Sequence, residues 1–114
     1  MAANSEIILS AQTHPGDSTT EAVTGDKFKG DGYYGRSDGL HTVQYTYTEL
    51  TGTIVIEATL AIEPGDSDWF YVHSYVASQE TSSKIQSITG NYVWIRAKLY
   101  NWTDGTINSI VLNH

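Results

Sequence analysis

A row of aromatic and basic residues near the end of the chain is the sequence feature most suited to chemistry. Alternate side chains of a strand point to opposite faces, so a strand over 92–100 would carry five such residues on one face: Tyr92, Trp94, Arg96, Lys98 and Tyr100. Flat rings stack on sugars, and Arg and Lys bond hydroxyls or carboxylates. The same residue types are enriched at protein interfaces. The row therefore predicts a glycan-binding surface or a subunit interface. The third alternative is packing inside the domain, with Arg96 paired to a carboxylate.

Three further aromatic residues are candidates for the same interface or glycan-binding role. Trp102 follows directly after the row. Tyr33 and Tyr34 lie in the segment GDGYYGRSDG, where four glycines and three charged residues argue against a regular element. These two tyrosines either attach the loop to the core or offer a contact surface.

The sequence carries no recognisable catalytic motif. It contains no Gly-x-Ser-x-Gly elbow, no Walker loop and no His-Glu-x-x-His pattern. Glu57 is the best candidate for acid–base chemistry, because the apolar residues Ile56 and Ala58 flank it. An outward-facing glutamate on a half-solvated sheet explains the same pattern better. We therefore predict that the protein is not an enzyme and has no catalytic residue.

Two acidic loops supply the only oxygen-rich candidates for a metal. The chain has no cysteine and its four histidines lie far apart, so zinc is not expected. The loops contain four candidate calcium ligands: Asp31, Asp38, Asp66 and Asp68. Neither loop matches the EF-hand pattern, and Asp/Gly-rich loops are usually plain turns. We therefore expect no cofactor and keep a structural calcium as the alternative.

The segments that contain these residues are predicted to be short strands. Alternating or apolar segments predict strands over eight ranges: 7–12, 19–23, 41–48, 53–62, 69–76, 85–89, 92–100 and 106–112. Turn signals separate them, including Glu49 to Gly52 and a tight turn at Asp104-Gly105. The stretch 77–84 is polar and indistinct. About eight strands with turns every 8 to 12 residues or so predict an all-β antiparallel sandwich or jelly roll.

Size and composition limit the chain to one domain, residues 1–114. A mass of 12.6 kDa corresponds to roughly 6,200 Å² of surface when folded and about 18,000 Å² when extended. About two-thirds of the surface is then buried, which is enough to fold without disulfides. Eight tyrosines and three tryptophans agree with a strand-rich fold.

Charge and hydropathy exclude several classes of partner. The net charge of −7 argues against nucleic acid, whose binding needs clustered lysine and arginine. The N-terminal segment lacks both a basic stretch and a long apolar run, so we expect no signal peptide, and no apolar stretch reaches the length of a membrane span. We expect no nucleic acid and no membrane among its partners.

From His41 onward, the order of the segments resembles small β-sandwich proteins of tailed bacteriophages, above all marine myoviruses that infect cyanobacteria. The matching pieces are a strand of alternating Tyr and Thr, TGTIVIEATL, a Pro-Gly loop that closes in Asp68-Trp69, and GNYVWIRAKLYNWTDGTI. The resemblance covers about two-thirds of the chain. Residues 1–40 look particular to this protein.

The segments also resemble galactose-binding-like sandwiches, the jelly roll of discoidin-type and carbohydrate-binding modules. Residues 52–56 match the Gly-led hydrophobic strand of these domains, and Gly90, Tyr92, Ile95 and Arg96 match a later strand. Both motifs describe a scaffold and not a chemistry.

These resemblances imply a non-enzymatic virion structural protein of a tailed phage, made in the host cytoplasm. It would be a docking module for capsid decoration, neck or tail. Its partners would be other virion proteins and copies of itself, with a trimer as the natural homo-oligomer at a capsid three-fold site. Multiple weak contacts would then add up to firm attachment. The alternative is a carbohydrate-binding module for surface glycans.

Overall fold

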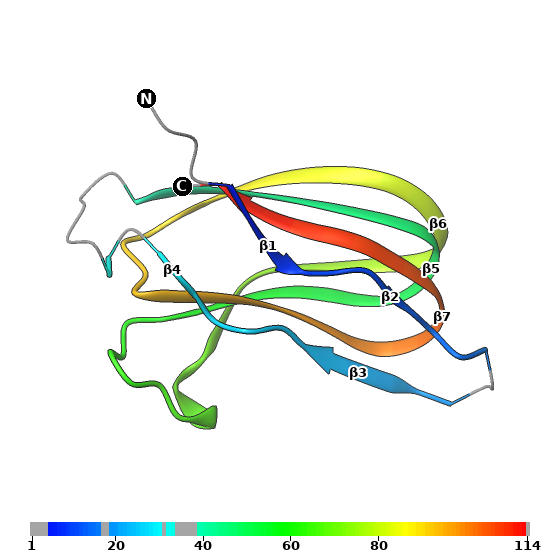
Figure 1. Cartoon of the computed structure of the whole chain (residues 1–114), viewed down its shortest axis with the longest axis horizontal. Helices are drawn as coiled ribbons and strands as arrows, with labels where there is room; N and C mark the ends of the chain where they lie inside the picture. Colours follow the sequence, from blue (N-terminus) through cyan, green and yellow to red (C-terminus); the bar gives the residue numbers. More distant parts are fainter. Residues whose placement is uncertain (1–4, 17–18, 31, 34–38, 114) are drawn as a thin grey trace.

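The computed structural model describes residues 5–16, 19–30, 32–33 and 39–113 and shows an antiparallel β-sandwich (Figure 1). These residues form seven strands, against about eight expected: β1 Ser5–Leu9, β2 Gln12–Thr13, β3 Glu21–Thr24, β4 Phe28–Lys29, β5 Leu40–Thr59, β6 Phe70–Thr89 and β7 Trp94–Asn113. A 3-10 turn, Asp66–Asp68, precedes β6. The predicted all-β class is confirmed.

Three strands of 20 residues each build both layers of the sandwich. Strands β5, β6 and β7 bend together at the right-hand end of Figure 1. Each contains one non-glycine residue with positive φ: Glu49 at 48°, Gln79 at 49° and Asn101 at 50°. The strand pairing also shifts register between Tyr47 and Thr51. Such irregularities let a paired strand turn sharply and continue into a second layer.

The prediction that the chain reverses direction at 49–52 and at Asp104-Gly105 is therefore wrong. Both segments are bends within continuous strands. A bend and a tight turn need the same left-handed backbone, so they attract the same residues. At Gly105, φ is 89° and a Cβ atom would collide with the carbonyl oxygen of Glu49. The indistinct stretch 77–84 likewise belongs to β6, a strand at the edge of the sheet path.

All strand pairs in the described residues are antiparallel, in the order β1-β7-β5-β6, and β2, β3 and β4 also pair with β7. One layer contains β1, β2, the start of β5 and the ends of β6 and β7. The other layer contains β3, β4, the end of β5 and the starts of β6 and β7. We call this second layer the lower sheet, since it occupies the lower half of Figure 1.

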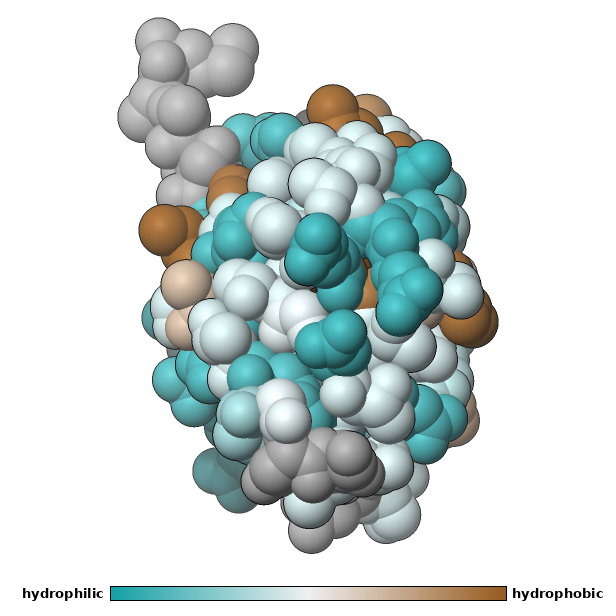
Figure 2. Space-filling view, turned by 90° about the vertical axis from the view of Figure 1, so that its right-hand side faces the viewer, coloured by the Kyte–Doolittle hydropathy of each residue, from teal (hydrophilic) through white to brown (hydrophobic). Residues whose placement is uncertain are grey.

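The core lies between the two layers and includes Tyr47, Ile54, Ile56, Leu99 and Ile110, all fully buried. Within the described residues, no helix is long and apolar enough to cross a membrane. Figure 2 looks onto the end where the long strands bend, and hydrophobic side chains appear mainly at its margins. The faces of the sheets are therefore the surfaces to search for a site.

Candidate functional site

The outer face of the lower sheet gathers most of the predicted aromatic–basic row. Along β7, Ile95, Ala97 and Leu99 are fully buried in the core, whereas four alternate residues face outward and are half-buried: Trp94, Arg96, Lys98 and Tyr100. We define the aromatic–basic face as these four residues together with the side chains that pack beside them: Lys27, Lys29, Tyr33, Glu57, Trp69 and Tyr71.

An ion pair occupies the middle of the aromatic–basic face. The guanidinium Nε of Arg96 donates to Oε1 of Glu57 at 2.8 Å, with side chains that are 18% and 6% exposed. The ring of Trp69 lies 4.2 Å from the guanidinium carbon. Glu57 thus faces outward as expected, but it is covered and not half-solvated. The carboxylate partner foreseen for Arg96 in the third alternative is Glu57.

Trp94 is held at the end of the face nearest the loop that follows β5. Its indole Nε1 donates to the carbonyl of Ile62 at 2.8 Å, and its ring lies 5.1 Å from that of Tyr33. The ammonium of Lys27 sits 4.6 Å from the Trp94 ring, and that of Lys29 sits 4.5 Å from the Tyr33 ring. Cations over aromatic faces are attracted by the ring quadrupole, so these contacts order the cluster.

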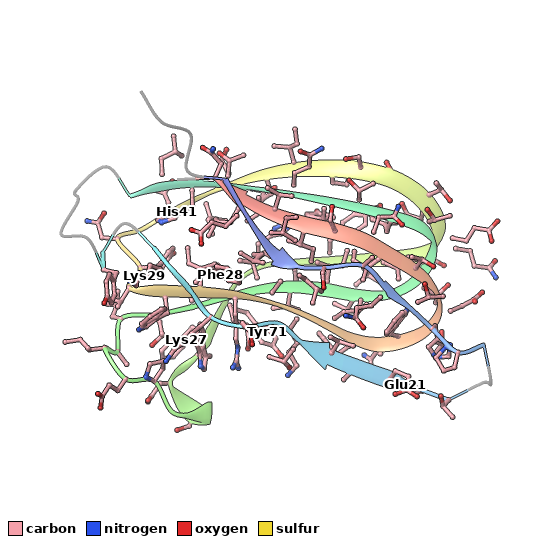
Figure 3. All side chains as sticks on the ribbon, viewed as in Figure 1. Glu21, Lys27, Phe28, Lys29, His41 and Tyr71 are labelled. Atoms are coloured by element: carbon pink, nitrogen blue, oxygen red, sulfur yellow. The ribbon has the colours of Figure 1, made fainter. Side chains whose placement is uncertain are left out.

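The opposite end of the face is more open. Lys98 Nζ lies 5.9 Å from the Tyr100 ring, and that ring lies 6.5 Å from the ring of Tyr71. The side chain of Tyr71, on β6, is 56% exposed. Figure 3 labels Lys27, Lys29 and Tyr71 in the same lower-left part of the view.

Sequence reasoning missed Lys27 and Lys29 as members of the face. Residue Lys29 pairs with Trp94 across the β4–β7 ladder, 65 positions along the chain. The alternation of Phe28 and Lys29 was the one available signal, because Phe28 packs on the core. Two residues are too few to predict a strand or its partner.

Tyr92 of the predicted row and the neighbouring candidate Trp102 lie elsewhere. Tyr92 precedes β7 and packs against the core: its ring is 5.9 Å from that of His41, and its hydroxyl donates to the carbonyl of Thr89 at 3.1 Å. Trp102 is only 3% exposed and contacts the His14 ring edge-on at 5.3 Å. The bend at Asn101 shifts the alternation by one residue and turns Trp102 inward. Tyr34 lies outside the described residues.

The calcium candidates receive no support from the geometry. Asp31, Asp38 and the side chain of Asp66 lie outside the described part of the chain. Asp68 accepts the backbone N–H of Gly65 at 2.7 Å through Oδ2, which closes the loop before β6. Among the residues that the structure describes, no three His, Asp or Glu side chains come together as metal ligands.

A second polar cluster lies near the bend at the β6 edge. The hydroxyls of Tyr75 and Tyr47 donate to the carboxylate of Glu80 at 2.7 and 3.2 Å, and the hydroxyl of Tyr45 bonds His73 Nε2 at 3.1 Å. Burial raises the pKa of Tyr47 and lowers the pKa of His73. The bond from Tyr75 lowers the pKa of Glu80. These interactions tie β5 to β6 and satisfy the buried polar groups.

An apolar cavity of about 380 Å³ opens beside the face, at the end of β5. Leu60, Phe70, Val72 and Tyr92 contribute to its lining, with Asp68 as its charged residue. Leu60 and Phe70 are also strongly exposed, at 69% and 68%. Ala58 belongs to the core, and Val72 and Tyr92 pack against it, so the cavity opens on the core side of the lower sheet and is not part of the aromatic–basic face.

The fold is shared with several solved structures. The family 29 carbohydrate-binding module CBM29_1 from Piromyces equi matches with a TM-score of 0.56 at 12% identity, over 100% of this chain and 93% of that one. The SPBc2 prophage-derived protein YomS matches with a TM-score of 0.58 at 13% identity, over 98% and 92%. The C-terminal CBM6 of LamC from Zobellia galactanivorans matches with 0.51 at 11%, over 99% and 100%.

No protein-family model matches the sequence, and no curated protein does. At identities this low, the structural likeness shows the fold alone. Two of these structures are carbohydrate-binding modules, and the β-sandwich they share with this chain agrees with the galactose-binding-like resemblance of the sequence.

Proposed function

We propose that the protein is a non-enzymatic docking module of a tailed-phage particle, acting in capsid decoration, neck or tail. The observation that carries this proposal is the aromatic–basic face, in which four half-buried residues of one strand face outward: Trp94, Arg96, Lys98 and Tyr100. Trp, Tyr and Arg dominate the energetics of protein interfaces, and a site built on a sheet keeps its geometry. The likeness of the whole fold to a prophage-derived protein supports a place in a phage.

In this proposal, the side chains of the aromatic–basic face already have their binding conformation before a partner arrives. The Arg96–Glu57 pair and the contact of Trp94 with Ile62 hold the side chains in place before binding. Preorganised side chains lose less conformational entropy when a partner arrives. Copies of the module arranged by particle symmetry, with a trimer as the expected oligomer, would bind together more firmly than one copy alone.

The test of this proposal is the composition of the particle. Mass spectrometry of gradient-purified virions should detect the protein at many copies per particle, and light scattering of the purified chain should give the mass of an oligomer. Virions that lack the protein would contradict the proposal whatever its oligomeric state. A monomer that is nevertheless present in virions would contradict only the homo-oligomer.

Carbohydrate recognition is the second candidate function. The observation that favours it is the pair of accessible rings on the face, since Tyr33 is 43% exposed and Tyr71 is 56% exposed. The fold shared with two carbohydrate-binding modules agrees with this function. Retention on a glycan array should be lost in Tyr71→Ala and kept in Ile85→Ala, a change at an exposed residue away from the face. Equal retention by both variants, or no retention by the unaltered protein, would refute it.

A further inference from the structure

The positive charge of this acidic protein is concentrated on the aromatic–basic face. Of the six Lys and Arg residues in the chain, four belong to the face: Lys27, Lys29, Arg96 and Lys98. The strand register places one carboxylate among them, Glu57. The formal charge of the face is then 4 − 1 = +3, which leaves −7 − 3 = −10 for the remainder of the protein. Asp26 and Asp68 directly precede the face residues Lys27 and Trp69 in the chain.

Three of the four cations have no carboxylate partner in the described residues. Lys27, Lys29 and Lys98 hold their ammonium groups 4.6, 4.5 and 5.9 Å from ring centroids. A cation–π contact leaves the N–H donors of an ammonium group available. Each of these lysines can therefore donate to an anionic oxygen without breaking an existing ion pair.

Along β7, two cations lie between two rings, over a length that suits a polymer. From Trp94 to Tyr100 the strand covers six residues, or about 20 Å at about 3.3 Å per residue. Arg96 and Lys98 lie between these two rings. Arg96 is already paired with Glu57, so the lysines are the cations that can meet acidic groups of a ligand. Rings that stack on sugar units, with lysine ammonium groups beside them, match a chain of charged sugars better than an acidic peptide.

We propose that the aromatic–basic face binds an acidic polysaccharide, carboxylated or sulfated. This inference rests on the second candidate function, carbohydrate recognition, and names its ligand class. The charge of −10 elsewhere would repel such a polymer from the other surfaces and confine it to this face. Nucleic acid is less suited, because the phosphate contacts of nucleic-acid binding need a larger basic surface.

The experiment compares acidic polymers with neutral counterparts of the same backbone. Affinity electrophoresis of the full chain would use polygalacturonate and its carboxyl-reduced form, and dextran sulfate and dextran. We expect binding at least tenfold tighter to one acidic polymer than to its neutral form, weakening as salt rises. Lys98→Gln and the double change Lys27→Gln/Lys29→Gln should each weaken binding at least fivefold.

The matched control is Lys84→Gln, because this lysine lies on the β6 edge near the Tyr75 ring, away from the face. It should bind like the unaltered protein, and Lys98→Arg should keep most of the affinity even if Lys98→Gln fails to fold. Equal binding of acidic and neutral polymers would overturn this inference and leave carbohydrate recognition standing. Binding of no polymer would overturn this inference, whereas carbohydrate recognition is refuted only if the glycan array also shows no retention. Equal weakening by Lys84→Gln and Lys98→Gln would show non-specific attraction and also overturn it.

Discussion

The Arg96–Glu57 pair allows a sharp test of how the aromatic–basic face is held in place. In Arg96→Met the carboxylate of Glu57 keeps its covered position but loses the 2.8 Å bond from the guanidinium. Removing one partner of a buried ion pair costs about 3–5 kcal/mol, because the remaining charge is desolvated without compensation. The 18% exposure of the Arg96 side chain favours the lower end, about 3 kcal/mol.

A double-mutant cycle separates this cost from simple loss of packing. The single variants Arg96→Met and Glu57→Met and the double variant would be compared by urea unfolding, followed by tryptophan fluorescence. We expect the double variant to regain most of the loss, since two apolar side chains of similar volume can replace a buried pair without penalty. A loss of about 3 kcal/mol also lowers the melting temperature by roughly 12 °C or more.

The reasoning would be refuted by a loss below about 1 kcal/mol in Arg96→Met, because that is the behaviour of a solvent-exposed pair. It would equally be refuted if the losses in the two single variants simply added in the double variant. Circular dichroism of each variant at 10 °C would establish that the native fold is compared throughout.

Three further predictions concern the core, the bend and the response to pH. Trp102→Ala should lower the free energy of unfolding by about 3–5 kcal/mol, because the Trp102 ring fills the core. Trp94→Ala should lower it by only about 1–2 kcal/mol, because the Trp94 ring is half-buried. Equal losses in the two variants would contradict this assignment. Gly105→Ala should lower the free energy of unfolding by about 3 kcal/mol, because Gly105 has a positive φ and a Cβ atom there would clash with the backbone. Gly16→Ala should lower it by only about 1 kcal/mol in the same urea assay, because Gly16 has a φ of 76° but open space around it. Burial raises the pKa of Tyr47 above its unfolded value of 10.0, so the contribution of Tyr47 to stability is complete below pH 10 and is lost as pH rises further. Urea midpoints measured from about pH 9 to 11 should therefore fall less steeply with pH in Tyr47→Phe than in the unaltered protein. Equal slopes in the two proteins would contradict the raised pKa.

The strand content and much of one face could be predicted from sequence because both depend on local alternation. Ile95, Ala97 and Leu99 alternate with outward residues, and that period survives in any regular strand. The prediction failed where the backbone becomes irregular. The segment before Trp94 is not a strand, so alternation does not place Tyr92 on the same face as Trp94.

The membership of the site depended on pairing over long distances. Lys29 reaches Trp94 only because β4 adds to the outer edge of β7 in one particular register. Glu57 finds Arg96 across the β5–β7 ladder in the same way. Two-residue strands and cross-strand partners have almost no signal in the local sequence, so these two contacts could not be predicted from the sequence.

The sequence by itself determined the all-β class, the acidic charge and the inward and outward sides of the regular strand segments, since these follow from composition and a period of two. The tertiary structure decided whether each Gly- or Asp-rich segment reverses the chain or bends it. The left-handed backbone at such a segment is compatible with both outcomes, and only the packing of two layers over a shared core selects between them. That selection carried Trp102 into the core and left Trp94 at the surface, although they lie eight residues apart on one strand.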